Sequence, residues 1–138
     1  ELVHQLKLDF PHLTIAINGG LTTNAQLTEQ LEHVDGVMLG REAYHNPWWL
    51  ADWDARFFGA TSAELTRESV EERMVDYMER EAAEHGTHWY SIARHMLGLR
   101  HGLAGSRKWR QVWRDHRLKT LPAREVFAIA SVQASAGA

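Results

Sequence analysis

The chain contains no cysteine. This absence excludes a disulfide framework, a thiolate metal site and a cysteine nucleophile within the chain. No apolar run approaches the ~20 residues that a membrane-spanning helix needs, and the first residues do not resemble a signal peptide. The sequence therefore predicts no membrane association, and we expect a cytoplasmic protein.

Metal-binding motifs are also missing, although the chain has nine histidines. There is no HExxH motif, which places two histidines on one face of a helix. His85 and His88 are three residues apart, but Gly86 between them is predicted to end a helix. His95 and His101 fall on different sides of a helix. We therefore predict no metal site.

An initiator methionine is absent as well, because the chain begins at Glu1, directly in an amphipathic stretch. Such a start is typical of the middle of a longer protein, with processing or recombinant expression as the alternatives. The amino-acid composition is that of a soluble globular protein, since 44% of the residues are hydrophobic and 24% are charged.

The first sixty residues alternate strand and helix signals, the spacing of a parallel α/β sheet. The predicted elements are a strand at residues 13–17, a helix capped by Thr22 or Thr23 and ending near residue 33, a strand at residues 37–39, and a tryptophan-rich turn or short helix opening at Asn46-Pro47. Two strands with exposed edges are a poor independent fold. This half therefore requires further strands, from missing sequence or from a partner chain.

After Gly59 the apolar residues recur at helical spacing, which predicts a helical bundle. The expected helices run from a Thr66 cap to Gly86, from a Thr87 cap to Gly102, from a Ser106 cap onward, and from near Pro122 to a frayed tail at residues 134–138. The predicted fold class is thus α/β plus all-α, with a boundary near residue 60.

Charge is distributed unevenly along the chain. Residues 1–61 and residues 62–85 each carry eight acidic residues against three Lys or Arg, whereas residues 91–127 carry nine Lys or Arg against two acids. A basic face on an otherwise acidic protein favours a polyanionic partner, and a solvated face without a ligand is the alternative.

The two predicted strands end in glycine turns, Asn18-Gly19-Gly20 and Gly40-Arg41. In an α/β barrel, the loops after the last two strands commonly form a phosphate site. Glycine lets the backbone N–H groups approach a phosphate closely, and Arg41 would add a bidentate cation. The alternative is that these glycines only make tight turns.

The residues from Ser106 to Arg114 combine two stripes of a helix. Arg107, Arg110 and Arg114 follow i, i+3, i+7 spacing, which suits phosphate binding, with a solvated surface as the alternative. Trp109 and Trp113 lie on a second, apolar stripe, and we interpret them as core residues rather than as base-stacking residues.

The turn motifs closely resemble those of the A-type tRNA-dihydrouridine synthases. The matching sequence segments are Ile17-Asn18-Gly19-Gly20, DGVMLGR at residues 35–41, AYHNP at residues 43–47 and HGLAGSRKWRQVWRDH at residues 101–116. The resemblance covers nearly all of the chain. It implies that residues 1–60 are the carboxy-terminal part of an FMN-binding TIM barrel, its last β/α units, and that residues 61–138 are a helical tRNA-binding domain.

The resemblance also implies an activity and its residues. Such an enzyme reduces uridine to 5,6-dihydrouridine in the tRNA D-loop, at U20 or U20a, with FMN and NADPH, and we expect a monomer. The implied FMN-phosphate residues are Asn18, Gly19, Gly20, Gly40 and Arg41. The implied tRNA-binding residues are Arg107 and Arg110, supported by Lys108 and Arg114. No catalytic residue is assigned, because the family's cysteine would precede Glu1, and we expect the chain alone to be inactive.

Two other functions compete with this one. A barrel enzyme that binds FMN or a sugar phosphate and acts on a small metabolite explains the glycine turns but not the basic helix. A stand-alone helical nucleic-acid-binding module explains the basic helix but not the strand–turn repeat. The two features together favour a flavoenzyme that acts on RNA.

Overall fold

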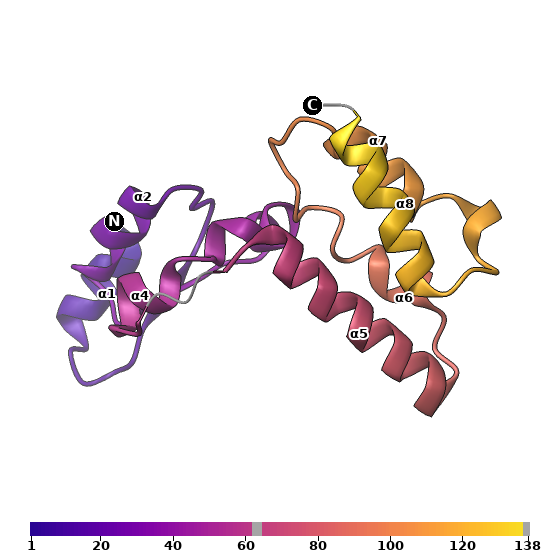
Figure 1. Cartoon of the computed structure of the whole chain (residues 1–138). Helices are drawn as coiled ribbons and strands as arrows, with labels where there is room; N and C mark the ends of the chain where they lie inside the picture. Colours follow the sequence, from indigo (N-terminus) through magenta and orange to yellow (C-terminus); the bar gives the residue numbers. More distant parts are fainter. Residues whose placement is uncertain (62–64, 137–138) are drawn as a thin grey trace. The chain divides into compact units, whose positions relative to one another are not determined.

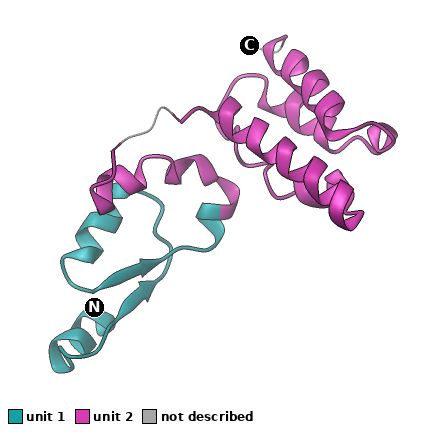
Figure 2. Cartoon of the chain, turned by 60° about the horizontal axis from the view of Figure 1, so that its bottom comes forward, with its two compact units in different colours: residues 1–43 teal, residues 44–138 magenta. Residues whose placement is uncertain are grey.

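The structure, a computed structural model, describes residues 1–61 and 65–136 of the chain (Figure 1). It divides into two compact units, residues 1–43 and residues 44–138, which Figure 2 colours separately. The predicted domain boundary near residue 60 stays a prediction, and residues 62–64 beside it lie outside the described part.

Unit 1 contains a two-stranded parallel sheet, as the alternating signals predict. Its elements are α1 (Leu2–Asp9), β1 (Ala16–Asn18), α2 (Asn24–Leu31), β2 (Gly36–Met38) and the start of α3 (Arg41–His45). β1 and β2 pair in register from Ala16 opposite Gly36 to Asn18 opposite Met38. Both strands are three residues long, so they are shorter than a usual strand of about 5–6 residues.

Little of unit 1 is buried. Leu27 and Val34 are its buried apolar side chains among the described residues, while Leu2 remains 88% exposed and Leu8 73% exposed. An ion pair joins α1 to the turn between α2 and β2, since Lys7 Nζ lies 2.7 Å from Asp35 Oδ2. The hydrogen bond from Lys7 lowers the pKa of Asp35. A core this small is poor support for a two-stranded sheet.

Unit 2 is helical. Its elements are the end of α3, the 3-10 helix η1 (Pro47–Leu50), α4 (Trp53–Phe58), α5 (Arg67–His85), α6 (Trp89–Ala93), α7 (Ser106–Trp113), the 3-10 helix η2 (His116–Leu118) and α8 (Ala123–Ser135). α8 packs against both α5 and α7, and α5 also packs against α6. Both ends of α5 are where the sequence predicts them. Thr66 caps its first turn through the Ser69 amide, and Gly86 ends it in the left-handed conformation at φ +67°.

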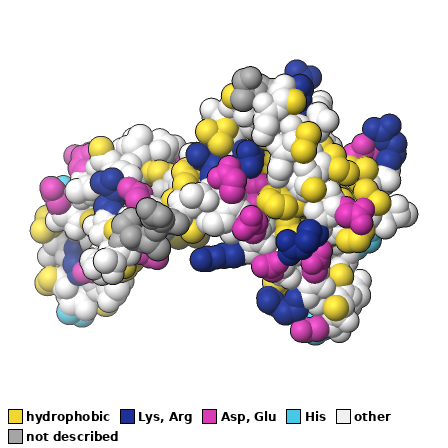
Figure 3. Space-filling view, viewed as in Figure 1, with side chains coloured by type: hydrophobic (Ala, Val, Ile, Leu, Met, Phe, Trp, Pro, Cys, Tyr) yellow, Lys and Arg dark blue, Asp and Glu magenta, His cyan; other side chains and the backbone are white. Residues whose placement is uncertain are grey.

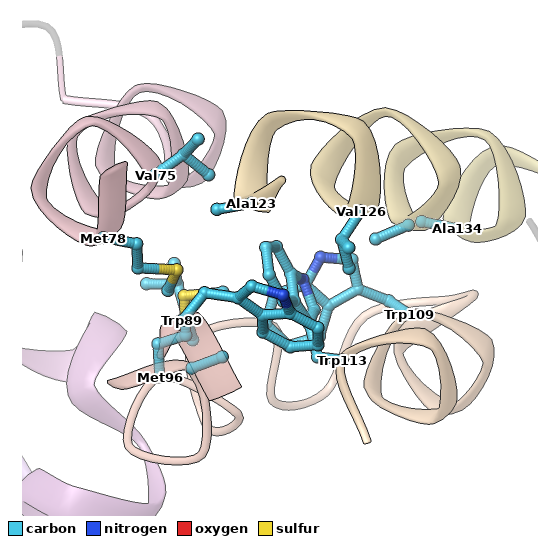
Figure 4. Close-up of a cluster of buried hydrophobic side chains, with 12 residues drawn as sticks. Val75, Met78, Trp89, Met96, Trp109, Trp113, Ala123, Val126 and Ala134 are labelled. Carbon is cyan, nitrogen blue, oxygen red and sulfur yellow. The ribbon is translucent and has the colours of Figure 1, made fainter. Parts of the chain in front are cut away.

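Tryptophan dominates the core of unit 2 (Figure 4). Trp109 is fully buried and Trp113 is 2% exposed, which confirms that both are core residues. Trp113 meets the ring of Trp89 edge to face, with 5.6 Å between centroids and an interplanar angle of 70°. Val75 and Met78 of α5 and Val126 of α8 complete the contact between the helices.

The second predicted helix is wrong in its start and its length. α6 has five residues, and the chain continues from Arg94 in turns rather than in a helix to Gly102. The cap is His88 instead of Thr87, because His88 Nδ1 accepts a hydrogen bond from the Tyr90 amide. The break has a packing cause: a Cβ on Gly98 would overlap the His45 carbonyl, so the backbone itself packs against the segment around Pro47.

The ends of α7 and α8 also differ from prediction. Ser106 is the first residue of α7, and the cap position belongs to Gly105 at φ +73°. A Cβ on Gly105 would overlap the carbonyl of Ala134, so glycine permits the close approach of the two helices. The tail is not frayed from residue 134, because Ala134 is buried and α8 continues to Ser135. Residues 137 and 138 lie outside the described part.

A buried ion pair connects α5 to the turns that follow α6. The carboxylate of Glu71 on α5 is fully buried, and Arg100 Nε donates to its Oε1 at 2.5 Å. Trp109 Nε1 donates to the other oxygen at 3.1 Å. Burial raises the pKa of Glu71, although Arg100 and Trp109 act in the opposite direction. Both carboxylate oxygens are thus occupied, and the hydrogen bond from Trp109 connects α7 to α5.

Candidate functional site

The structure brings the two glycine turns to one edge of the sheet. Asn18 is opposite Met38 in the parallel register, so Gly19-Gly20 and Gly40-Arg41 both leave the carboxyl ends of the strands. Gly20 has φ +57°, and a Cβ on Gly19 or Gly40 would meet no atom within 4 Å. All five predicted residues are exposed. Both turns are therefore open enough for a phosphate to approach the backbone.

The amino terminus of α2 follows the first glycine turn and is capped by side chains of its own first turn. Gln26 Oε1 accepts from the amides of Thr22 and Thr23 at 2.9 and 3.2 Å, and the Gln26 amide donates to Thr23 Oγ1. These donors are occupied by the capping box. The N–H groups of Gly19 and Gly20 are not among the donors that this capping box uses. The Arg41 side chain makes no hydrogen bond or ion pair to any described residue.

Two groups of arginines in unit 2 differ in whether they have partners. One group has structural partners: Arg100 pairs with Glu71, Arg124 with Asp76 and Glu79, and Arg117 with Asp115. Arg67 belongs to the same group, with its guanidinium 4.6 Å from the Trp48 ring centroid and its Nε donating to Leu99 O. In Figure 3, several of the dark blue side chains on unit 2 accordingly adjoin magenta ones.

The second group is the predicted stripe. Arg107, Arg110 and Arg114 make no ion pair or side-chain hydrogen bond within the described ranges. Arg107 and Arg110 lie on α7, where the first is exposed and the second half-buried, and Arg114 is the exposed C-cap residue. The stripe therefore presents guanidinium groups whose charge no acidic side chain compensates.

Lys108 differs from the stripe. Its Nζ donates to the carbonyl of Ala136 at 3.3 Å, just beyond the last turn of α8. A cation at a helix carboxyl end stabilises the exposed carbonyls. Lys108 thus has a structural contact in addition to the tRNA-binding role predicted for it.

The structure also contains a cleft beside the arginine stripe that the sequence patterns do not predict. It has a volume of about 290 Å³, lies between α6, the end of α7 and η2, and includes Arg114 in its lining. Its other cations, Arg94 and Lys119, are recognisable in the sequence only as members of the basic block. No helical or strand periodicity joins these residues, because they come from separate elements.

Two further features, a metal-ion cluster and a membrane-spanning helix, are absent from the part of the chain that the structure describes. Within residues 1–61 and 65–136, no three His, Cys, Asp or Glu side chains are grouped as they would be around a metal ion. No helix in the described part of the chain has the length and apolar character needed to cross a membrane.

Comparison with known proteins identifies the family. The family described as dihydrouridine synthase (Dus) matches residues 1–133. The chain belongs to the dihydrouridine synthase family. The family predicted from the turn motifs is thereby confirmed, and enzymes of this family are in general flavin-dependent.

Curated relatives agree with the family. A tRNA-dihydrouridine(20/20a) synthase of Vibrio cholerae is 47% identical over 108 residues, which cover 78% of this chain and 33% of the relative. The protein of the same name from Salmonella typhi is 49% identical over 109 residues, 79% of this chain and 32% of the relative. The protein of the same name from Shewanella oneidensis is 44% identical over 130 residues, which cover 94% of this chain and 38% of the relative. The chain spans about a third of the length of these dihydrouridine synthases.

Proposed function

We propose that the chain is part of an A-type tRNA-dihydrouridine synthase, which reduces uridine to 5,6-dihydrouridine at positions 20 and 20a of the tRNA D-loop. Residues 1–60 would supply the last β/α units of the TIM barrel, and residues 61–138 the tRNA-binding helical domain. Support comes from the family match and from the names of the relatives. The observation that carries the role of this chain is the unpaired arginine stripe of α7.

The glycine turns are the proposed site of the FMN phosphate. Backbone N–H groups of Gly19, Gly20 and Gly40 would donate to it, and Asn18 and Arg41 would hold it with their side chains. The open space at Gly19 and Gly40 fits this group, because a phosphate can reach the backbone there. FMN, when bound and reduced by NADPH, supplies the hydride that uridine receives.

The chemistry assigned to this chain is binding and orientation. It has no cysteine to donate a proton to the uracil ring, so we expect the 138-residue chain alone to reduce no uridine. Its two turns would anchor the flavin by the phosphate. Its α7 surface would bind the tRNA.

The arginine stripe suits the backbone of a folded RNA. Guanidinium groups bind phosphate in a bidentate manner and keep their charge at every relevant pH. Arg107, Arg110 and Arg114 are spaced along about two turns of helix, so several successive phosphates are within their reach. Lys108 adds a further cation beside them.

A tRNA titration at two salt concentrations tests this proposal. We expect the chain to bind unmodified tRNA, and Arg107→Ala/Arg110→Ala to bind more weakly. Two lost phosphate contacts should reduce the slope of log K against log salt by roughly 1.5. Arg73→Ala/Arg80→Ala is the matched control, because it removes the same charge from α5. Equal losses in both double variants would mean that net charge, and not the stripe, binds the RNA.

A further inference from the structure

The cleft beside α7 combines aromatic side chains with cations. Trp89 and Trp113 form its buried part, and Tyr90 of α6, which is 39% exposed, stands at its surface. Lys119 Nζ lies 3.9 Å from the centroid of the Tyr90 ring. The His116 ring lies 6.4 Å from the same ring, tilted by 52°. An exposed ring beside the Lys119 ammonium is an arrangement that binds a base together with its phosphate.

The charge of the cleft is not compensated by its one acidic residue. Asp115 accepts hydrogen bonds from Arg117 Nε and Nη2 on both carboxylate oxygens, at 2.8–3.2 Å, and from the Arg117 amide. These bonds lower the pKa of Asp115 to about 2. Arg114 has no partner among the described residues, and Arg94 donates through Nε to the neutral acceptor His95. The cleft therefore keeps a net positive charge.

Trp113, one of the residues that line the cleft, carries a buried hydrogen-bond donor without a partner within the described ranges. Trp113 Nε1 is the buried side-chain atom without a partner in the described part of the chain. The other two core indoles are satisfied, because Trp109 Nε1 donates to Glu71 and Trp89 Nε1 donates to Leu121 O. A buried polar group left unpaired in a native fold suggests a ligand or solvent partner.

The size and position of the cleft restrict its ligand. Its volume of about 290 Å³ is just below the ~300–1,000 Å³ of ligand pockets, so it suits one nucleotide rather than a dinucleotide. Arg114 belongs both to the arginine stripe and to the cleft lining. A phosphate backbone that follows Arg107 and Arg110 therefore arrives at the cleft, where a base turned out of its stack can enter.

We propose that this cleft, formed by Tyr90, Arg94, Trp113, Arg114, His116 and Lys119, binds one unstacked nucleotide of the tRNA. The inference rests on the proposed tRNA-binding function and adds a specific subsite to it. Folded RNA is recognised mainly at loops and bulges, where unstacked bases can rest on aromatic side chains. The stripe would thus hold the backbone, and the cleft would fix the register of the RNA along α7.

Tyr90→Leu tests the subsite, and Tyr90→Phe is its control. Leucine removes the aromatic face but no charge, so tRNA affinity should fall about 5- to 150-fold, the range that stacking of one base on an aromatic ring spans. The salt slope and the affinity for a fully paired RNA hairpin should stay unchanged, and Tyr90→Phe should bind as the wild type does. Circular dichroism and thermal unfolding of each variant check that the helices persist.

Two shorter ligands identify the source of the nucleotide. Single-stranded pentauridylate should bind to the wild type and lose affinity in Tyr90→Leu, whereas uridine 5′-monophosphate should bind at least ~10-fold more weakly because it lacks neighbouring phosphates. Equal affinity for the two ligands would make the cleft a site for free mononucleotides and overturn the proposal. Failure of the wild type to bind pentauridylate would overturn it too.

The outcomes separate the subsite from the proposed function. If Tyr90→Leu binds tRNA as tightly as the wild type while Arg107→Ala/Arg110→Ala shows a reduced salt slope, the proposed subsite is wrong. The tRNA-binding role of the arginine stripe is then retained. If Tyr90→Leu weakens tRNA and the paired hairpin equally, the effect of Tyr90 is structural and the subsite is again wrong. If the wild type binds pentauridylate through Tyr90 but shows no affinity for tRNA, the proposed function fails and the cleft remains a nucleotide site.

Discussion

Replacing Arg100 by methionine should destabilise unit 2 strongly. The Arg100 side chain is 10% exposed and the Glu71 carboxylate is fully buried, so the substitution leaves a buried carboxylate without its counter-charge. Removing one partner of a buried ion pair costs about 3–5 kcal/mol. A typical domain has only about 5–15 kcal/mol of stability. Arg100→Met should therefore remove a large part of the free energy of unfolding of unit 2 at pH 7.

The loss should depend on pH with a definite sign. Burial already raises the pKa of Glu71, and removal of Arg100 takes away its main opposing interaction. The protonated carboxyl is then favoured in the folded state. Its contribution to stability is complete at a pH below the pKa of the unfolded chain and is lost as the pH rises through the folded pKa. Arg100→Met should accordingly be least destabilising in acid and most destabilising near neutral pH.

Urea unfolding followed by tryptophan fluorescence measures both effects, since Trp109 and Trp113 lie in the same core. Glu71→Leu/Arg100→Met is the decisive comparison, because an apolar pair of similar volume often leaves stability unchanged. The double variant should therefore be more stable than either single variant. If the double variant lost as much as the two single losses together, the residues would be energetically independent and the reasoning would be wrong.

Two further predictions concern the backbone of α7 and the charge of η2. Gly105→Ala should destabilise the chain by about 1–3 kcal/mol more than Gly102→Ala, because both glycines have positive φ but only Gly105 adjoins another backbone, and urea unfolding of both variants measures the difference. A comparable loss in the two variants would contradict close helix packing. Arg117→Ala should raise the pKa of Asp115 from about 2 towards 3.8, as followed by NMR of the carboxyl. Because the folded pKa is lowered, the stability that this pair contributes is present above pH 3.8 and lost as the pH falls through about 2, and an unchanged titration in the variant would refute the pairing.

The sequence predicts best those features that depend on neighbouring residues. The ends of α5 are recognisable because Thr66 and Ser69 cap each other within one turn and Gly86 adopts a left-handed conformation. The length of α6 is not recognisable, although its apolar spacing continues to Leu99. The backbone of Gly98 packs against His45, which is 53 positions earlier in the sequence, and that contact overrides local helix propensity.

The same distinction applies to the candidate site. The spacing of Arg107, Arg110 and Arg114 is a local pattern and predicts their shared stripe. Which arginines are free to bind RNA is not local, because the partners of Arg100 and Arg124 lie 29 to 48 residues away in sequence. The cleft is also invisible to pattern analysis, since Tyr90, Arg94 and Lys119 meet only after α6 and η2 have packed together.

The contact of Gly98 with the His45 carbonyl has a consequence for exchanging parts between related enzymes. The segment from Tyr44 to Leu50 belongs to the predicted barrel part, residues 1–60, yet within unit 2 it supplies the carbonyl against Gly98 and the Trp48 ring under Arg67. A chimaera joined at residue 60 would combine this segment from one parent with its packing surface from another. A junction before Tyr44 keeps both sides of the contact in the same parent.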